Sequence, residues 1–134
     1  MTQAAEPTDA ITRRSIAFVF PGQGSQYVGM GADLVRHSPA AAAVYERADA
    51  ALGHPLSHMI LEGPAEELDL TINAQPAILA TSIAYLEAMR DEARLAGIEI
   101  VPRAVAGHSA GQYAAAVAAN AIDFDDALRL VRVR

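Results

Sequence analysis

The stretch that decides the fold is Ala104-Val105-Ala106-Gly107-His108-Ser109-Ala110-Gly111, where a short apolar run leads into a G-x-S-x-G motif. We predict a short buried strand over residues 104–107 and a helix from about Ala110 to Ala119. A serine at such a junction is typical of a nucleophile elbow, in which strained backbone exposes the hydroxyl. The Ala110 amide would lie at a helix N-terminus, which favours negative charge. Ser109 is therefore a candidate nucleophile, and Gly107 and Gly111 would let strand and helix approach closely.

The motif alone leaves a second interpretation, in which Ser109 only caps the helix that follows it. A nucleophilic serine needs a base within hydrogen-bonding reach. His108 is adjacent in sequence, so its side chain should point away from the serine hydroxyl. The 25 residues after Ser109 contain no histidine, and the sequence therefore does not identify the base.

The three remaining histidines precede the motif, and we expect His37, His54 and His58 to be ordinary solvated side chains. His54 and His58 flank Pro55, which places them outside a regular helix, and no third ligand is evident. We therefore predict no metal site.

Alternating apolar runs and helix signals predict an α/β fold with a hydrolase-like parallel sheet core flanked by helices. The other strand is expected at Ser15–Phe20, a continuous apolar run of the kind buried on both faces, and Ile98–Val101 is a further extended candidate. Two or three strands are few for such a domain, so we interpret the chain as incomplete. The remaining helices are expected at about Met30–His37, Ser38–Leu52, from Gly63-Pro64 onward, Gln75–Leu95 with Asn73 as its cap, and Asp123–Arg134.

Composition limits the classes of protein and partner. The chain has 134 residues, 52% of them hydrophobic, and a formal net charge of -6, so we expect one domain or less and no nucleic-acid partner. The apolar runs are far shorter than the ~20 residues that span a bilayer, so no membrane association is expected. The absence of cysteine excludes a thiolate nucleophile and suits the cytoplasm. Residues 1–14 are polar, and we expect a disordered N-terminal tail followed by one structured unit over residues 15–134.

Four segments in this order resemble the malonyl-CoA:acyl carrier protein transacylase family: Phe18–Gln26 (FVFPGQGSQ), Gly63–Leu68 (GPAEEL), Gln75–Ala77 (QPA) and Gly107–Gly111 (GHSAG). The match covers the chain from about Ser15 onward. It implies the N-terminal portion of an acyltransferase α/β domain, with the catalytic histidine and a small ferredoxin-like subdomain beyond this chain. The implied reaction moves a malonyl group from malonyl-CoA to the phosphopantetheine thiol of acyl carrier protein, in fatty acid or polyketide synthesis. It proceeds through a serine-linked acyl-enzyme, and no tightly bound cofactor is implied.

The resemblance also assigns roles to residues. Ser109 would carry the acyl group, and the backbone amides of Gln23 and Ala110 would form the oxyanion hole. Arg134 would pair with the malonyl carboxylate, as a guanidinium can through two parallel hydrogen bonds. Supporting positions are Gly22 and Gly24, which let the Gln23 amide approach the substrate, with Gly107, His108 and Gly111 around the serine.

Two neighbouring arginines are not expected to take these roles, and two positions near the serine differ from the usual residue of the family. Arg129 and Arg132 are expected to be solvated helix charges, not carboxylate ligands. Ala110 stands where the family usually has a larger aliphatic residue, and Gln112 stands where it usually has glutamate. The smaller Ala110 side chain would loosen the acyl pocket, whereas its backbone role is unaffected.

Two other functions compete with the transferase. The elbow alone also fits a serine esterase or thioesterase, although a hydrolase needs neither the Gln23 loop nor a carboxylate-binding arginine at position 134. The other alternative is a catalytically incomplete fragment that at most binds carrier protein.

Overall fold

The protein, described here by a computed structural model over residues 15–134, has a small parallel sheet surrounded by helices; the tail expected over residues 1–14 lies outside the described residues. Strands β1 (Ala17–Phe20) and β2 (Ala104–Gly107) pair with Ala17 opposite Ala104 and Phe20 opposite Gly107. The α/β class with a parallel sheet is therefore confirmed. In chain order the helices are α1 (Ala32–His37), α2 (Pro39–Leu52), α3 (Leu56–Glu62), α4 (Ala65–Leu68), α5 (Thr71–Leu95), α6 (Gly111–Ala118) and α7 (Phe124–Val133).

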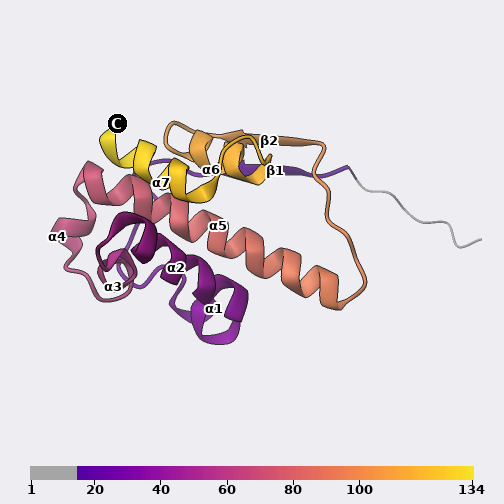
Figure 1. Ribbon diagram of the computed structural model, residues 1–134, viewed down its shortest axis with the longest axis horizontal. Helices are drawn as coiled ribbons and strands as arrows, with labels where there is room; N and C mark the ends of the chain where they lie inside the picture. The colour runs from indigo at the N-terminus through magenta and orange to yellow at the C-terminus, as the bar shows by residue number, and fades with distance from the viewer. Residues whose placement is uncertain (1–14) are drawn as a thin grey trace, which may run out of the picture.

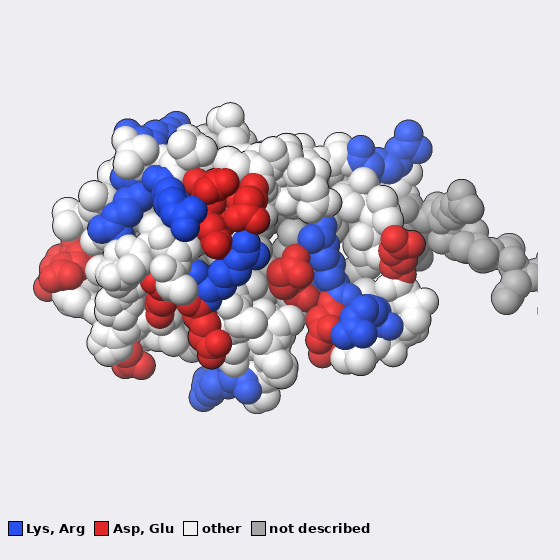
Figure 2. Space-filling model, in the orientation of Figure 1, with Lys and Arg blue, Asp and Glu red and all other residues white. Residues whose placement is uncertain are grey.

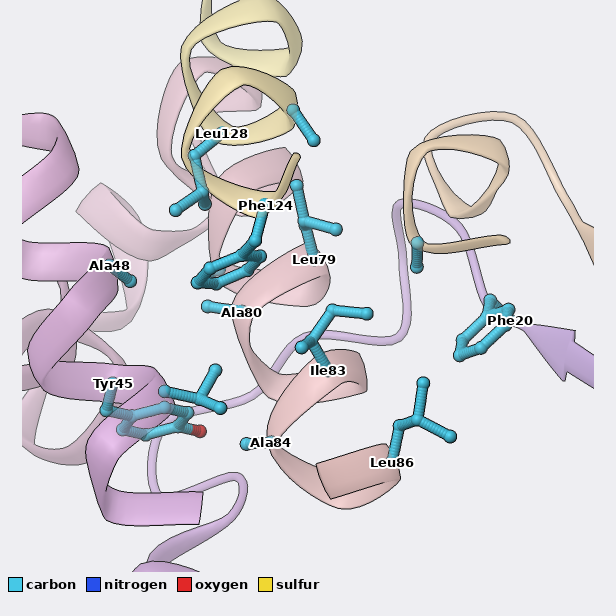
Figure 3. Packing of buried hydrophobic residues seen from close by; sticks show 14 of the residues in the cluster. Phe20, Tyr45, Ala48, Leu79, Ala80, Ile83, Ala84, Leu86, Phe124 and Leu128 are labelled. Carbon is cyan, nitrogen blue, oxygen red and sulfur yellow. The ribbon is translucent and has the colours of Figure 1, made fainter. Parts of the chain in front are cut away.

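Helix α5 is the central support of the fold. It runs between α1, α2 and α3 on one side and the sheet with α6 and α7 on the other (Figure 1). Small buried side chains let its neighbours approach: Ala77, Ala80 and Ala84 are fully buried. Figure 3 shows Phe124 and Leu128 of α7 packed beside α5 residues such as Leu79. The helix that ends at Val133 is thus seated on the core.

A buried polar contact ties α2 to α5. The Tyr45 hydroxyl donates to the Met30 carbonyl oxygen at 3.0 Å and lies 2.8 Å from Thr81 Oγ1. Burial raises the pKa of Tyr45 to about 12, so the phenol stays protonated and remains a donor. This contact fixes the turn before α1 against the core.

The expectation that the strands are buried is wrong for one face of the sheet. Phe20 is buried, but Val19 on the opposite face is 76% exposed, and Ala104 and Ala106 of β2 are also exposed. Within residues 15–134, helices pack against only one face of the two-stranded sheet. The extended segment expected at residues 98–101 is an irregular connection and not a strand.

Two helix predictions also need correction. Asn73 does not cap α5, which begins at Thr71; its side-chain amide instead donates to the Glu67 carbonyl oxygen at 2.9 Å, inside the first turn. Helix α3 was not predicted, and it contains His58. The Asp49 carboxylate accepts from the Ser57 amide at 2.7 Å. Because Asp49 lies on α2, no local signal marks this helix start.

None of the helices within residues 15–134 combines the length and the apolar character that crossing a membrane requires.

Candidate active site

The G-x-S-x-G motif forms a strained turn between β2 and α6. Ser109 has φ +49°, a left-handed conformation that is uncommon for a residue other than glycine. The His108 amide donates to Phe20 O at 3.1 Å, and the Gly111 amide donates to His108 O at 2.9 Å. The Ser109 residue is exposed, and α6 has no side-chain cap among the described residues. The capping interpretation of Ser109 therefore does not hold.

Backbone segments meet at the turn without room for side chains. A Cβ added to Gly107 would lie 2.0 Å from the Gly111 carbonyl oxygen. A Cβ on Gly111 would lie 2.4 Å from Phe20 O and 2.6 Å from Pro21 O. Contacts this short are sterically forbidden, so glycine is required at both positions. The end of β1, the serine turn and the start of α6 are consequently in backbone contact.

The loop after β1 lies against the serine turn. A Cβ on Gly22 would come within 2.5 Å of His108 O and 2.9 Å of His108 Nδ1. Gln23 follows Gly22, and Ala110 precedes Gly111, so the two expected oxyanion amides belong to segments that touch. At Gly24 a Cβ would meet no protein atom within 4 Å, but φ is +105°, a backbone conformation that favours glycine.

Within residues 15–134, no hydrogen bond joins His108 to the serine hydroxyl. Its imidazole lies beside Gly22. This placement agrees with the expected direction of the side chain, away from the serine hydroxyl. His108 thus supports the loop and offers no base to Ser109 in this arrangement.

Arg134, at the end of α7, lies beside the candidate nucleophile. Its Nη2 donates to Ser109 Oγ at 3.3 Å. Both residues border an open cavity of about 360 Å³, lined by Ser109, Gln112, Tyr113, Ala116, Ile122 and Arg134. The Ser109 hydroxyl therefore faces the cavity beside a permanent positive charge.

Helix α7 is held at its start by a cluster of charges. Asp123 caps it by accepting from the Asp125 amide at 2.9 Å. Arg47 of α2 pairs with Asp123 at 3.1 Å and with Asp125 at 2.6 Å, and lies 5.4 Å from the centre of the Phe124 ring. The hydrogen bond from the Asp125 amide, followed by the nearby Arg47, lowers the pKa of Asp123. Figure 2 shows acidic and basic side chains next to one another on the face in view.

The other charged residues of α7 differ in their surroundings. Arg129 is exposed and pairs with Asp126 at 3.0 Å, as expected for a solvated charge. Arg132 is half-buried and its Nη1 contacts His54 Nε2, so the expectation that Arg132 and His54 are solvated is wrong. The partners are 78 residues apart, which explains why local sequence gave no signal. Burial lowers the pKa of His54, and the nearby Arg132 charge lowers it further.

The two remaining histidines are exposed, as expected, and His37 Nδ1 lies 2.8 Å from Asp33 O. Within residues 15–134 no group of histidine, aspartate or glutamate side chains is arranged to hold a metal ion.

Two residues near the Gln23 loop were not singled out from sequence. Thr71 Oγ1 accepts from Gln23 Nε2 at 3.0 Å, and Asp69 Oδ1 accepts from Gln26 Nε2 at 2.9 Å. The paired residues are 48 and 43 positions apart in the chain. Only the fold brings them together.

Comparison with known proteins identifies the family. The family profile described as acyl transferase domain matches residues 17–134. The chain belongs to the acyl transferase family. It is 52% identical over 119 residues to the malonyl CoA-acyl carrier protein transacylase of Bacillus subtilis, which covers 89% of this chain and 36% of that protein. It is 47% identical over 118 residues to the transacylase of the same name from Escherichia coli K12; the aligned region covers 88% of this chain and 37% of that protein.

Solved structures of acyl transferases show the same fold. The acyl-carrier-protein-S-malonyltransferase from Bartonella henselae superposes with a TM-score of 0.81 at 44% identity, over 90% of this chain and 38% of that one. A malonyl-transacylase solved in complex with its type II PKS acyl-carrier protein gives a TM-score of 0.79 at 42% identity, over 90% and 37%. The chain thus spans little more than a third of the length of these relatives.

The backbone contact at Gly111 predicts a large cost for a single methyl group. Gly111→Ala should lower the free energy of unfolding by about 3 kcal/mol, because the Cβ would overlap two carbonyl oxygens. Gly97→Ala is the control, because Gly97 has φ +72° but open space around it. There the free energy of unfolding should fall by only about 1 kcal/mol, the cost of placing alanine in the left-handed conformation. Urea denaturation of both variants measures the difference. Equal losses would show that the space at Gly111 is not the constraint.

The His54–Arg132 contact predicts a pH-dependent stability. The folded-state pKa of His54 lies below its ordinary value of 6.5, so its contribution is fully present above that pH. As the pH falls through the lowered pKa, the imidazole is protonated beside Arg132 and the contribution is lost. His54→Asn should therefore make stability fall less steeply below pH 6.5. Denaturation midpoints measured across this range test this expectation, and identical slopes for wild type and His54→Asn contradict the assignment.

Proposed function

We propose that the complete protein transfers a malonyl group from malonyl-CoA to the phosphopantetheine thiol of acyl carrier protein. In this proposal residues 15–134 form the N-terminal portion of its acyltransferase α/β domain. The observation that carries it is the 3.3 Å contact between Arg134 Nη2 and the hydroxyl of the strained Ser109. The names of the relatives support the same substrates.

Ser109 is proposed as the nucleophile. Its Oγ attacks the thioester carbonyl carbon of malonyl-CoA, the carbonyl oxygen gains negative charge, and the amides of Gln23 and Ala110 donate to it. The carbon–sulfur bond then breaks, CoA leaves as the thiol, and a malonyl ester remains on Ser109. The carrier-protein thiol attacks this ester in the reverse sequence and regenerates the hydroxyl.

The proton of the hydroxyl needs an acceptor. His108 lies beside Gly22, and within residues 15–134 no hydrogen bond joins its side chain to Ser109. We propose that the base is a histidine in the remaining length of the complete protein, since the matched relatives are nearly three times as long as the aligned region; it would take this proton and pass it to the departing CoA sulfur. Loss of such a base typically lowers turnover by several orders of magnitude.

Arg134 is proposed to select a carboxylated acyl group. A guanidinium holds a carboxylate through two charge-assisted hydrogen bonds and stays charged when water is excluded. The side chain lies in the cavity that borders Ser109. An esterase for uncharged esters would have no use for a cation there, which favours the transferase over the hydrolytic alternative.

The setting of the reaction follows from these substrates. Acyl carrier protein is the proposed partner, and the solved relative in complex with its type II PKS acyl-carrier protein supports that choice. Fatty acid and polyketide synthesis both use such a carrier. We propose a cytoplasmic location, which the absence of cysteine suits, and no tightly bound cofactor.

Ser109→Ala tests the nucleophile. The complete wild-type protein, incubated with radiolabelled malonyl-CoA, should acquire label on the peptide that contains Ser109, and the variant should acquire none. Adding carrier protein should move the label to its thiol. Label that leaves Ser109 only to water would instead indicate a thioesterase, and label retained by Ser109→Ala would exclude this serine.

Arg134→Gln tests the carboxylate contact. The variant should lose about 10²-fold in kcat/KM for malonyl-CoA, because a neutral amide replaces a charged, two-pronged donor. Acetyl-CoA, which lacks the carboxylate, should be used no worse than by wild type. Arg129→Gln is the matched control on the exposed side of α7. Equal losses with both substrates would rule out carboxylate selection.

A further inference from the structure

The loop Gly22–Gln26 contacts two other segments of the chain. Glycines flank Gln23, and Gly24 adopts φ +105°; within the loop the Ser25 hydroxyl donates to the Gly22 carbonyl oxygen at 2.8 Å. On one side it rests on the serine turn through the contact between Gly22 and His108. A donor to an oxyanion must lie about 2.7–3.1 Å from the developing charge, so one contact would not fix the Gln23 amide well enough.

The second support comes from the turn between α4 and α5. Gln23 Nε2 donates to Thr71 Oγ1 at 3.0 Å, and Gln26 Nε2 donates to Asp69 Oδ1 at 2.9 Å. The same Gln26 side chain accepts from the Gly24 amide at 2.8 Å through Oε1. The hydrogen bonds therefore hold the loop on both sides of the Gly24 turn.

The turn that provides these acceptors is itself fixed. Asn73 is 8% exposed, and its side-chain amide donates to Glu67 O at 2.9 Å. The Asp69 amide donates to Ala65 O at 2.9 Å, and the Asn73 amide to Leu70 O at 2.8 Å. Thr71 is the first residue of α5, the helix at the centre of the core. The loop is thus tied to the hydrogen-bonded turn that leads into α5.

We infer that Thr71 and Asp69 are positioning residues that hold the Gln23 backbone amide in place to receive the oxyanion. The inference rests on the proposed function. The two side chains act through the loop, and the thioester does not touch them. Since the oxyanion forms only in the transition state, their loss should lower kcat and leave substrate binding largely intact.

The test uses the complete protein and single-turnover acylation of Ser109 by labelled malonyl-CoA. Thr71→Val, which keeps the shape but removes the acceptor, should slow acylation by about three- to tenfold with KM within about twofold. Thr71→Ser and Asp69→Asn keep an oxygen acceptor and should restore most of the wild-type rate. Thr81→Val is the matched control: it removes the contact with Tyr45 in the core and should lower the melting temperature without changing the acylation rate.

A double-mutant cycle makes the test independent of folding losses. Gln23→Ala removes the side chain but keeps the backbone amide, so it should slow acylation as much as Thr71→Val, and the double variant should be no slower than either. Additive losses, or a wild-type acylation rate in Thr71→Val, would overturn the inference while leaving Ser109 labelled. Absence of label on Ser109 in the wild type would instead overturn the proposed function on which it rests.

Discussion

Close backbone packing at the serine turn is the constraint on which the site depends. The absence of a Cβ at Gly107 and Gly111 lets the end of β1, the turn and the start of α6 touch. This crowding forces Ser109 into the left-handed region and holds it there, because neither the strand nor the helix can move away without losing its place in the fold. The strain is local, and the packing around it is extensive.

The part of the site that the sequence predicts well is the part encoded locally. The G-x-S-x-G motif specifies its own turn, and the strand-to-helix context is visible in the neighbouring residues. The approach of Arg134 to Ser109 was expected from family resemblance, and the structure places the two side chains together. The roles of both residues stay predictions until they are tested.

The features that sequence did not predict involve partners on different elements, from 8 residues apart in the chain for Asp49 and Ser57 to 78 for His54 and Arg132. The start of α3 depends on Asp49, the half-buried state of Arg132 depends on His54, and the support of the loop depends on Thr71. The exposure of Val19 was missed for another reason. An apolar run indicates that a strand is able to be buried on both faces, but whether a layer covers it depends on the rest of the fold. Asn73 shows the same limit, because a residue suited to cap a helix serves here inside its first turn.

The length of helix α7 sets where the Arg134 guanidinium lies relative to Ser109. Phe124 is buried at its start and Arg134 follows its last residue, Val133, so one end is anchored in the core and the other reaches the serine. Each residue in an α-helix adds about 1.5 Å of length and about 100° of rotation. A single insertion or deletion within α7 would therefore swing the guanidinium to another side of the helix, even with every contact at Phe124 preserved. Substitutions on the exposed side, such as at Leu130, would leave that register intact.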